Sequence, residues 1–265
     1  MFHRILVPVD FSACSENALR LAIDFASKHK ASLTVLSVCS VHQTPVTNNS
    51  LNQDTIMENL KGYEQNMAKL ASIDHTFELE IGLAADVITE KGATHDLIIM
   101  GTKGKHDAID KLVGSVSLKV IQHSTIPVMV IPEELNMISF DKIVFAADFK
   151  KIEHMSNLDK LRELALAYDS ELHLLNVNES SEFISEDESD EAMELHNFFE
   201  DVNHAFFLSK HKDIEEGIMS YTDEKSISIL ALMPRKHTFL QSLFQHNTTH
   251  NVVMQLKTAL LSFHE

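Results

Sequence analysis

Short apolar runs alternate with longer amphipathic stretches along the first half of the chain. Five runs rich in β-branched and aliphatic residues predict strands at residues 3–9, 32–38, 75–81, 96–100 and 127–131. The stretches between them predict helices near residues 15–29, 52–72, 84–93 and 112–123. Ser12 or Ser15 is expected to cap the first helix. The last four strands are apolar on both faces, so we expect helices to bury them in an open, doubly wound α/β sheet of mainly parallel strands.

The second half of the chain repeats the first. Residues 2–11 and 140–149 both read as an apolar strand that ends in Asp-Phe, which makes Asp10 and Asp148 equivalent. The similarity continues at lower fidelity toward the end of the chain. We therefore expect two tandem α/β domains, 1–136 and 137–265, each with a five-stranded sheet flanked by helices.

The first repeat carries a spaced glycine motif after its fourth strand. Gly101 and Gly104 follow the strand, and Gly114-Ser115 opens the next helical pattern. A glycine-rich turn lets backbone N–H groups approach an anion, and a helix N-terminus adds further donors. The hydroxyls of Ser115 and Ser117 can add hydrogen bonds. On spacing alone, a phosphate site and an ordinary turn followed by a helix cap are equally good interpretations.

Three landmarks of the first repeat resemble the universal stress protein family. They are the opening Val7-Pro8-Val9-Asp10-Phe11-Ser12, the strand end at Val38, and the spacing Gly101-x2-Gly104-x9-Gly114-Ser115. The landmarks occur in order across the whole first repeat, and the spaced glycines resemble those of the family's ATP-binding branch. The resemblance implies a five-stranded α/β fold that binds an adenine nucleotide as ATP, with Mg²⁺ as an accompanying ion left open.

The resemblance also implies which residues contact the nucleotide. Asp10 would lie at the nucleoside end, the backbone of Val38 would meet adenine, and Pro8, Val9 and Met100 would line the pocket. The phosphates would be held by the motif glycines and by the first residues of the following helix: Gly101, Gly104, Gly114, Ser115, Val116 and Ser117.

Universal stress proteins generally pair through their last strands, and the resemblance implies the same for the two repeats. Strands 128–131 and 258–262 would then meet within one chain and bury both apolar edges. The expected product is an intrachain pseudo-dimer, and a further homodimer of whole chains stays open.

The second repeat departs from the glycine motif. Aligned through Lys236-His237, Leu232 stands in place of Gly101 and Gln245 in place of Gly114. Side chains at these positions would occupy the space in which the backbone must approach phosphate, and a positive φ would be costly for them. We therefore expect one nucleotide per chain.

Composition narrows the choice of partners and compartment. Lys and Arg number 22 against 39 Asp and Glu, and the net charge of −17 repels the phosphates of nucleic acids and of anionic membranes. The longest apolar run, 126–132, is too short to span a bilayer, and no export segment is visible. We expect a cytoplasmic protein without nucleic-acid or membrane partners, and a solvated loop in the acidic stretch 179–191.

Catalytic and metal signals are weak. His246 and His250 have a spacing that can place two imidazoles on one helical face, but no third ligand is nearby in sequence, so no metal site is expected. Lys103, His106 and Asp107 lie where they could meet the γ-phosphate, although a polar loop is the simpler interpretation. We expect an ATP-binding stress-response or regulatory protein without an identified catalytic residue. A slow ATPase and a nucleotide-free interaction module are the alternatives.

Overall fold

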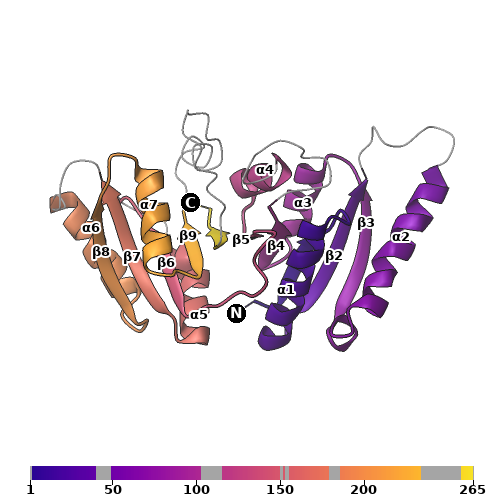
Figure 1. Ribbon diagram of the computed structural model, residues 1–265, viewed down its shortest axis with the longest axis horizontal. Helices are drawn as coiled ribbons and strands as arrows, with labels where there is room; N and C mark the ends of the chain where they lie inside the picture. Colours follow the sequence, from indigo (N-terminus) through magenta and orange to yellow (C-terminus); the bar gives the residue numbers. More distant parts are fainter. Residues whose placement is uncertain are drawn as a thin grey trace. The chain divides into compact units, whose positions relative to one another are not determined.

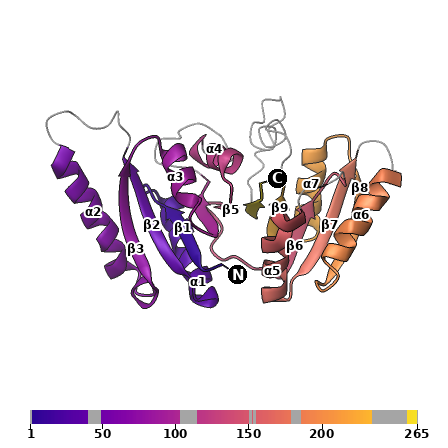
Figure 2. The same cartoon turned by 180° about the vertical axis from the view of Figure 1, so that it is seen from behind.

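The computed structural model describes residues 2–39, 49–102, 115–149, 152, 155–178, 186–233 and 258–264. These residues divide into two compact units, one up to Asn136 and one from Met137 onward. Each unit is a sheet with helices on both faces (Figure 1, and from behind in Figure 2). The expected α/β fold with mainly parallel strands is confirmed. Within the described ranges, no helix is long and apolar enough to cross a membrane.

The first unit is a parallel sheet in the order β3-β2-β1-β4-β5. Its strands are β1 (Arg4–Pro8), β2 (Ser32–Cys39), β3 (His75–Ile81), β4 (Leu97–Gly101) and β5 (Val128–Ile131). Its helices are α1 (Ala13–His29), α2 (Asn49–Asn66), α3 (Ala84–Gly92) and α4 (Ser115–His123). The direction of winding reverses between β1 and β4, and a sheet of this kind binds ligands beyond the carboxyl ends of the strands at that point.

Helix α1 shows how the local sequence directs the fold. Ser12 is its N-cap, and the Ser12 side chain accepts a hydrogen bond from the backbone N–H of Ser15. The predicted apolar face packs into the core, where Ala18, Leu19 and Phe25 are all buried. The helix therefore presents its N-terminus at the carboxyl edge of the sheet.

Two expectations for the first unit are wrong. The helix expected over 52–72 ends at Asn66, and a separate turn of 3₁₀ helix covers Leu70–Ser72. Strand β3 is not buried on both faces, because it is the edge strand and none of its residues is fully buried. One face of an edge strand tolerates charged residues, and Glu78 and Glu80 lie there.

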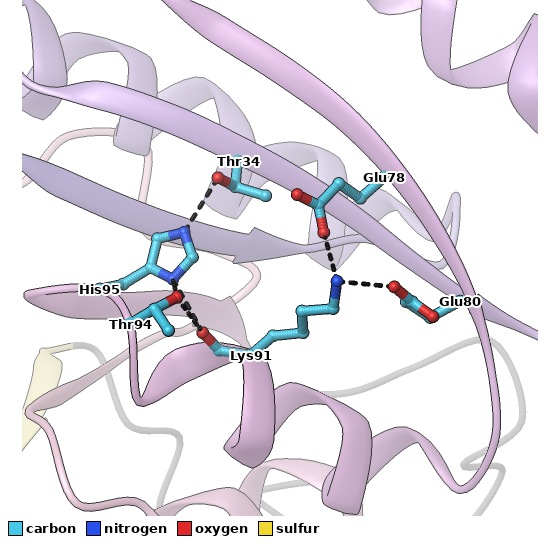
Figure 3. Close-up of polar contacts among 6 residues, drawn as sticks. All are labelled: Thr34, Glu78, Glu80, Lys91, Thr94 and His95. Carbon is cyan, nitrogen blue, oxygen red and sulfur yellow. Dashed lines mark hydrogen bonds and ion pairs between the residues drawn. The ribbon is translucent and has the colours of Figure 1, made fainter.

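Helix α3 is fastened to β3 and β2 by polar contacts (Figure 3). Lys91 Nζ lies 2.9 Å from a carboxylate oxygen of Glu78 and 2.6 Å from one of Glu80. His95 Nε2 lies 2.9 Å from Thr34 Oγ1, and its Nδ1 lies 2.9 Å from the Lys91 carbonyl oxygen. These contacts join α3 to the edge strand β3 and join the turn after α3 to the first half of β2.

The second unit repeats this plan in the order β10-β9-β6-β7-β8. Its strands are β6 (Lys142–Ala146), β7 (Glu171–Asn178), β8 (His204–Lys210), β9 (Ile229–Leu232) and β10 (Ala259–Ser262). Its described helices are α5 (Asp159–Tyr168), α6 (Glu186–Phe198) and α7 (Ile214–Glu224), with a 3₁₀ turn at Met155–Leu158.

Backbone geometry confirms the internal repeat. Val7 lies opposite Val35 in the first unit, and Phe145 lies opposite Leu174 in the second, as the sequence alignment requires. The phenylalanine after each equivalent aspartate has a left-handed backbone, with φ of 61° at Phe11 and 46° at Phe149.

The expectation of a loop throughout 179–191 is wrong for its second half. Residues from Glu186 onward belong to α6. Glu191 is only 4% exposed, and its carboxylate accepts a hydrogen bond of 3.0 Å from the backbone N–H of Ile152. The hydrogen bond from Ile152, which is distant in sequence, therefore offsets the cost of burying the Glu191 carboxylate.

Candidate functional site

The end of β1 forms the floor of the candidate site. Val9 donates its backbone N–H to the Leu36 carbonyl of β2 at 2.8 Å. Successive residues of a strand point their backbone polar groups to opposite sides, so the backbone nitrogen of Pro8 points toward β4. The pairing of β1 with β4 covers Ile5 and Leu6 and does not extend to Pro8. Proline has no N–H to donate, and the ladder therefore stops before the end of the strand.

Asp10 lies in a tight hydrogen-bonded turn directly after this strand. Its carboxylate accepts the Ser12 hydroxyl at 2.5 Å and the Ser12 backbone N–H at 3.1 Å. The Asp10 N–H in turn donates to Ser15 Oγ at 3.3 Å. The side chain of Asp10 is exposed, and the turn holds it at the N-terminus of α1.

Gly101 at the end of β4 packs against the first turn of α1. A Cβ atom on Gly101 would lie 2.7 Å from Cys14 Sγ and 2.9 Å from the Cys14 backbone carbonyl. No described glycine has a positive φ, so close packing rather than a left-handed backbone requires glycine at this position. The Cys14 thiol also lies 3.5 Å from Thr102 Oγ1, which links α1 to the segment after β4.

Helix α4 begins beside the same strand end. Ser117 is buried and donates its hydroxyl hydrogen to the Gly101 carbonyl oxygen at 2.8 Å. Ser115 is exposed and Val116 is half-buried. The first N–H groups of a helix have no partners within the helix, so the start of α4 offers backbone donors next to Gly101.

The other expected pocket residues are distributed over the same edge. Pro8, Val9 and Met100 are buried, and Val38 is half-buried near the end of β2. Gly104 and Gly114 lie outside the described residues, as do Lys103, His106 and Asp107. The structure thus brings Asp10, Gly101 and the start of α4 to the ends of adjacent strands around α1.

Tyr63 is a neighbour of the site that the sequence did not indicate. Its ring stacks on Phe11, with 5.8 Å between centroids and 16° between ring planes. Burial, followed by the negative charges of Glu16 and Asp10, raises the pKa of the Tyr63 hydroxyl. The side chain comes from α2, and no local pattern reveals that it reaches the Asp10 turn.

The described residues fit an adenine nucleotide in two respects. An apolar floor of Pro8, Val9 and Met100 suits the flat face of a base or the carbon atoms of a ribose. The start of α4 beside Gly101 suits phosphate. The described charges in the Asp10 turn are carboxylates, so this turn itself offers no cation to a phosphate.

The second unit has a different arrangement at the equivalent place. Its β6–β9 pairing continues to Ala146, which lies opposite Leu232. By the register of the two ladders, Leu232 is the counterpart of Met100, and Met233 is the counterpart of Gly101. The sequence alignment that placed Leu232 opposite Gly101 was therefore wrong by one residue. Neither alignment places a glycine in the second unit at the position of Gly101.

Comparisons with known proteins cover both units. The model of the universal stress protein family matches residues 1–132. The chain is 31% identical over 160 residues to a universal stress protein of Staphylococcus saprophyticus, which is 56% of this chain and 95% of that protein. It is 29% identical over 161 residues to one of Staphylococcus haemolyticus, covering 57% and 96% respectively.

Two solved structures are similar over nearly the whole chain. A universal stress protein from Archaeoglobus fulgidus has a TM-score of 0.71 at 18% identity and covers 98% of this chain and 97% of that one. One from Pseudomonas aeruginosa has a TM-score of 0.59 at 14% identity and covers 99% and 93%. At these identities the likeness concerns the fold.

Proposed function

Because the chain belongs to the universal stress protein family, we propose that its first unit binds one ATP molecule where β1 and β4 end. The observation that carries the proposal is the meeting of three elements around Gly101. The α1 N-terminus packs on it through Cys14, and α4 is fastened to it by the Ser117 hydroxyl. Both helices therefore point their N-termini at one edge of the sheet, which favours an anionic ligand.

The proposed roles of the residues follow their positions. Asp10 and the Val38 backbone contact the nucleoside, above a floor of Pro8, Val9 and Met100. The phosphates are bound by the backbone of Gly101, Gly104 and Gly114 and by the start of α4 at Ser115, Val116 and Ser117. The Ser117 hydroxyl already donates to Gly101, so we assign to it the positioning of α4 as well. Mg²⁺ would accompany ATP through the phosphates.

We propose one nucleotide per chain. Met233 replaces Gly101 in the second unit, and the β6–β9 ladder continues to its end at Ala146. Asp148 and Val177 are retained there, but these two residues alone do not make a nucleotide site. The second unit then acts as a structural partner, and the pairing of strand 128–131 with strand 258–262 stays a prediction from the sequence.

The protein is proposed to act in the cytoplasm as a stress-response or regulatory switch rather than as an enzyme. A switch requires that bound ATP favours one conformation, whereas an ATPase must also position a water molecule and stabilise the developing charge. Asp10 is held in its turn by Ser12 and faces the nucleoside end in this assignment, not the γ-phosphate. We therefore expect hydrolysis of bound ATP to be far slower than the roughly 1–10³ s⁻¹ typical of enzymes.

A matched pair of substitutions tests the assignment. Asn at position 10 keeps an oxygen for the Ser12 hydrogen bonds but removes the charge, so Asp10→Asn should weaken ATP binding by roughly 10- to 100-fold. Asp148→Asn makes the same change in the second unit and should leave the affinity unchanged. Equal affinity of the two variants for ATP would contradict the assignment. Mass spectrometry of an extract of the purified protein would show in addition whether an adenine nucleotide accompanies it.

A further inference from the structure

The first residue of each edge strand is an equivalent histidine. His75 begins β3 and lies opposite Leu33, while His204 begins β8 and lies opposite Leu172, the counterpart of Leu33 in the repeat. Each histidine has its Nδ1 close to the carbonyl oxygen two residues earlier, at 2.8 Å for His75 and 2.9 Å for His204. A carbonyl oxygen can only accept, so each neutral ring carries its hydrogen on Nδ1 and a lone pair on Nε2.

The two repeats differ in what faces that lone pair. In the first unit it is a carboxylate, because Glu64 of α2 places an oxygen 3.7 Å from His75 Nε2. In the second unit it is another imidazole, because His196 of α6 places its Nδ1 2.9 Å from His204 Nε2. The change from carboxylate to imidazole places two ring nitrogens at hydrogen-bond distance, where His196 Nδ1–H donates to the lone pair on His204 Nε2. A metal ion bound by both nitrogens would take the place of this hydrogen, and His196 would then carry its proton on Nε2.

We propose that His196 Nδ1 and His204 Nε2 together bind a divalent transition-metal ion, with Cu²⁺ bound most tightly. Two metal–nitrogen bonds of about 2.0–2.1 Å at a right angle place their nitrogens about 2.9 Å apart, and right angles occur in the tetragonal geometry of Cu²⁺. The observed separation is 2.9 Å. A tetrahedral ion such as Zn²⁺ would need a separation of about 3.3 Å, so it should bind more weakly.

The surroundings of the pair suit a metal ion that reaches it from solvent. His196 is exposed on the last turn of α6, and His204 is half-buried. The Val202 carbonyl fixes the ring of His204 through Nδ1, in the manner of the outer partners of metal-bound histidines. Across the described ranges, no group of three or more His, Cys, Asp or Glu side chains is placed to hold a metal, so water would complete the coordination.

Metal binding by full-length variants tests the proposal. Nucleotide-free protein is titrated with Cu²⁺ and followed by calorimetry and electron paramagnetic resonance. His196→Gln and His204→Gln should each lose one equivalent of bound Cu²⁺, together with the spectrum of an ion bound by two nitrogens. His75→Gln is the matched control in the first unit and should keep every equivalent.

A gain-of-binding variant gives an independent test. Glu64→His in the first unit places a second imidazole before His75 Nε2 and should add one equivalent of bound Cu²⁺. The proposal is overturned if either His196→Gln or His204→Gln keeps the parent's full number of equivalents. It is equally overturned if His75→Gln loses the same equivalent, or if Glu64→His gains none.

Discussion

Pro8 and Ala146 occupy the same position in the two repeats, and each pairs with a strand on one side, but only Ala146 also pairs on the other side, with β9. Ala146 lies opposite Leu232, whereas the β1–β4 pairing stops at Leu6 and Ile98. The difference follows from the missing N–H of proline. The strand ends at the switch point are therefore less tightly joined in the unit that carries the glycine motif.

Pro8→Ala should weaken ATP binding. The substitution restores an N–H that faces β4, so the hydrogen bonds between β1 and β4 can extend to the end of β1. The two strand ends would then lie closer together and close the floor of the proposed pocket. Stability should change by less than about 1 kcal/mol, because the new hydrogen bond offsets the greater freedom of the unfolded chain. Calorimetric titration of the parent and the variant measures the effect. If both bind ATP equally well, the gap in the ladder has no part in binding.

Gly101→Ala should destabilise the protein by about 1–3 kcal/mol, because the new methyl group would overlap the Cys14 backbone and thiol. Gly62→Ala is the matched control. Gly62 lies in α2 with no atom within 4 Å of an added Cβ, and alanine there should stabilise the protein by up to about 1 kcal/mol. Urea denaturation of both variants measures the difference. Similar free energies of unfolding would contradict the close packing of Gly101 on α1.

Lys91→Met should destabilise the first unit by up to about 1 kcal/mol, since it leaves Glu78 and Glu80 without their shared cation in a partly exposed place. Lys69→Met removes an ion pair of 2.7 Å with Asp24, in which the lysine is 75% exposed, and should have little effect. The comparison is made by denaturation at low ionic strength. An equal loss of stability in both variants would mean that the ion pairs of Lys91 with Glu78 and Glu80 stabilise the protein no more than the exposed pair of Lys69 with Asp24.

The three tyrosines should titrate only when the chain unfolds. Burial raises the pKa of Tyr63, Tyr168 and Tyr221 above the ordinary value of 10.0. A phenol that ionises more readily in the unfolded chain contributes stability that is complete below about pH 10 and is lost as the pH rises above it. Tyrosinate absorbance is easily followed because the chain has no Trp. Tyrosinate that forms at pH 10 while circular dichroism still shows the folded state would contradict this prediction.

The sequence predicted most of the fold because its elements are local and repeated. The apolar face of α1, the Ser12 cap and the strand positions all follow from residues within one turn or one strand. The burial of β3 was predicted wrongly because strand order, not the strand's own sequence, makes it an edge. The burial of Glu191 was missed for a similar reason, since its partner Ile152 lies 39 residues away.

The candidate site was predictable in outline only. Spacing along the chain located Asp10, Gly101 and Ser117 at strand ends and a helix start. The packing of Gly101 on Cys14 and the stacking of Tyr63 on Phe11 depend on contacts between distant segments. The pairing of His196 with His204 was missed because a helix and the strand after it must first be packed together.

The central claim is that one nucleotide binds per chain, in the first unit. Calorimetric titration of the nucleotide-free, full-length protein with ATP and Mg²⁺ tests it most directly, because the number of sites is read from the binding curve. The account predicts one equivalent of ATP per chain, which Gly114→Val should abolish and Gln245→Val should leave intact. Two equivalents per chain, or one equivalent that survives Gly114→Val, would contradict it.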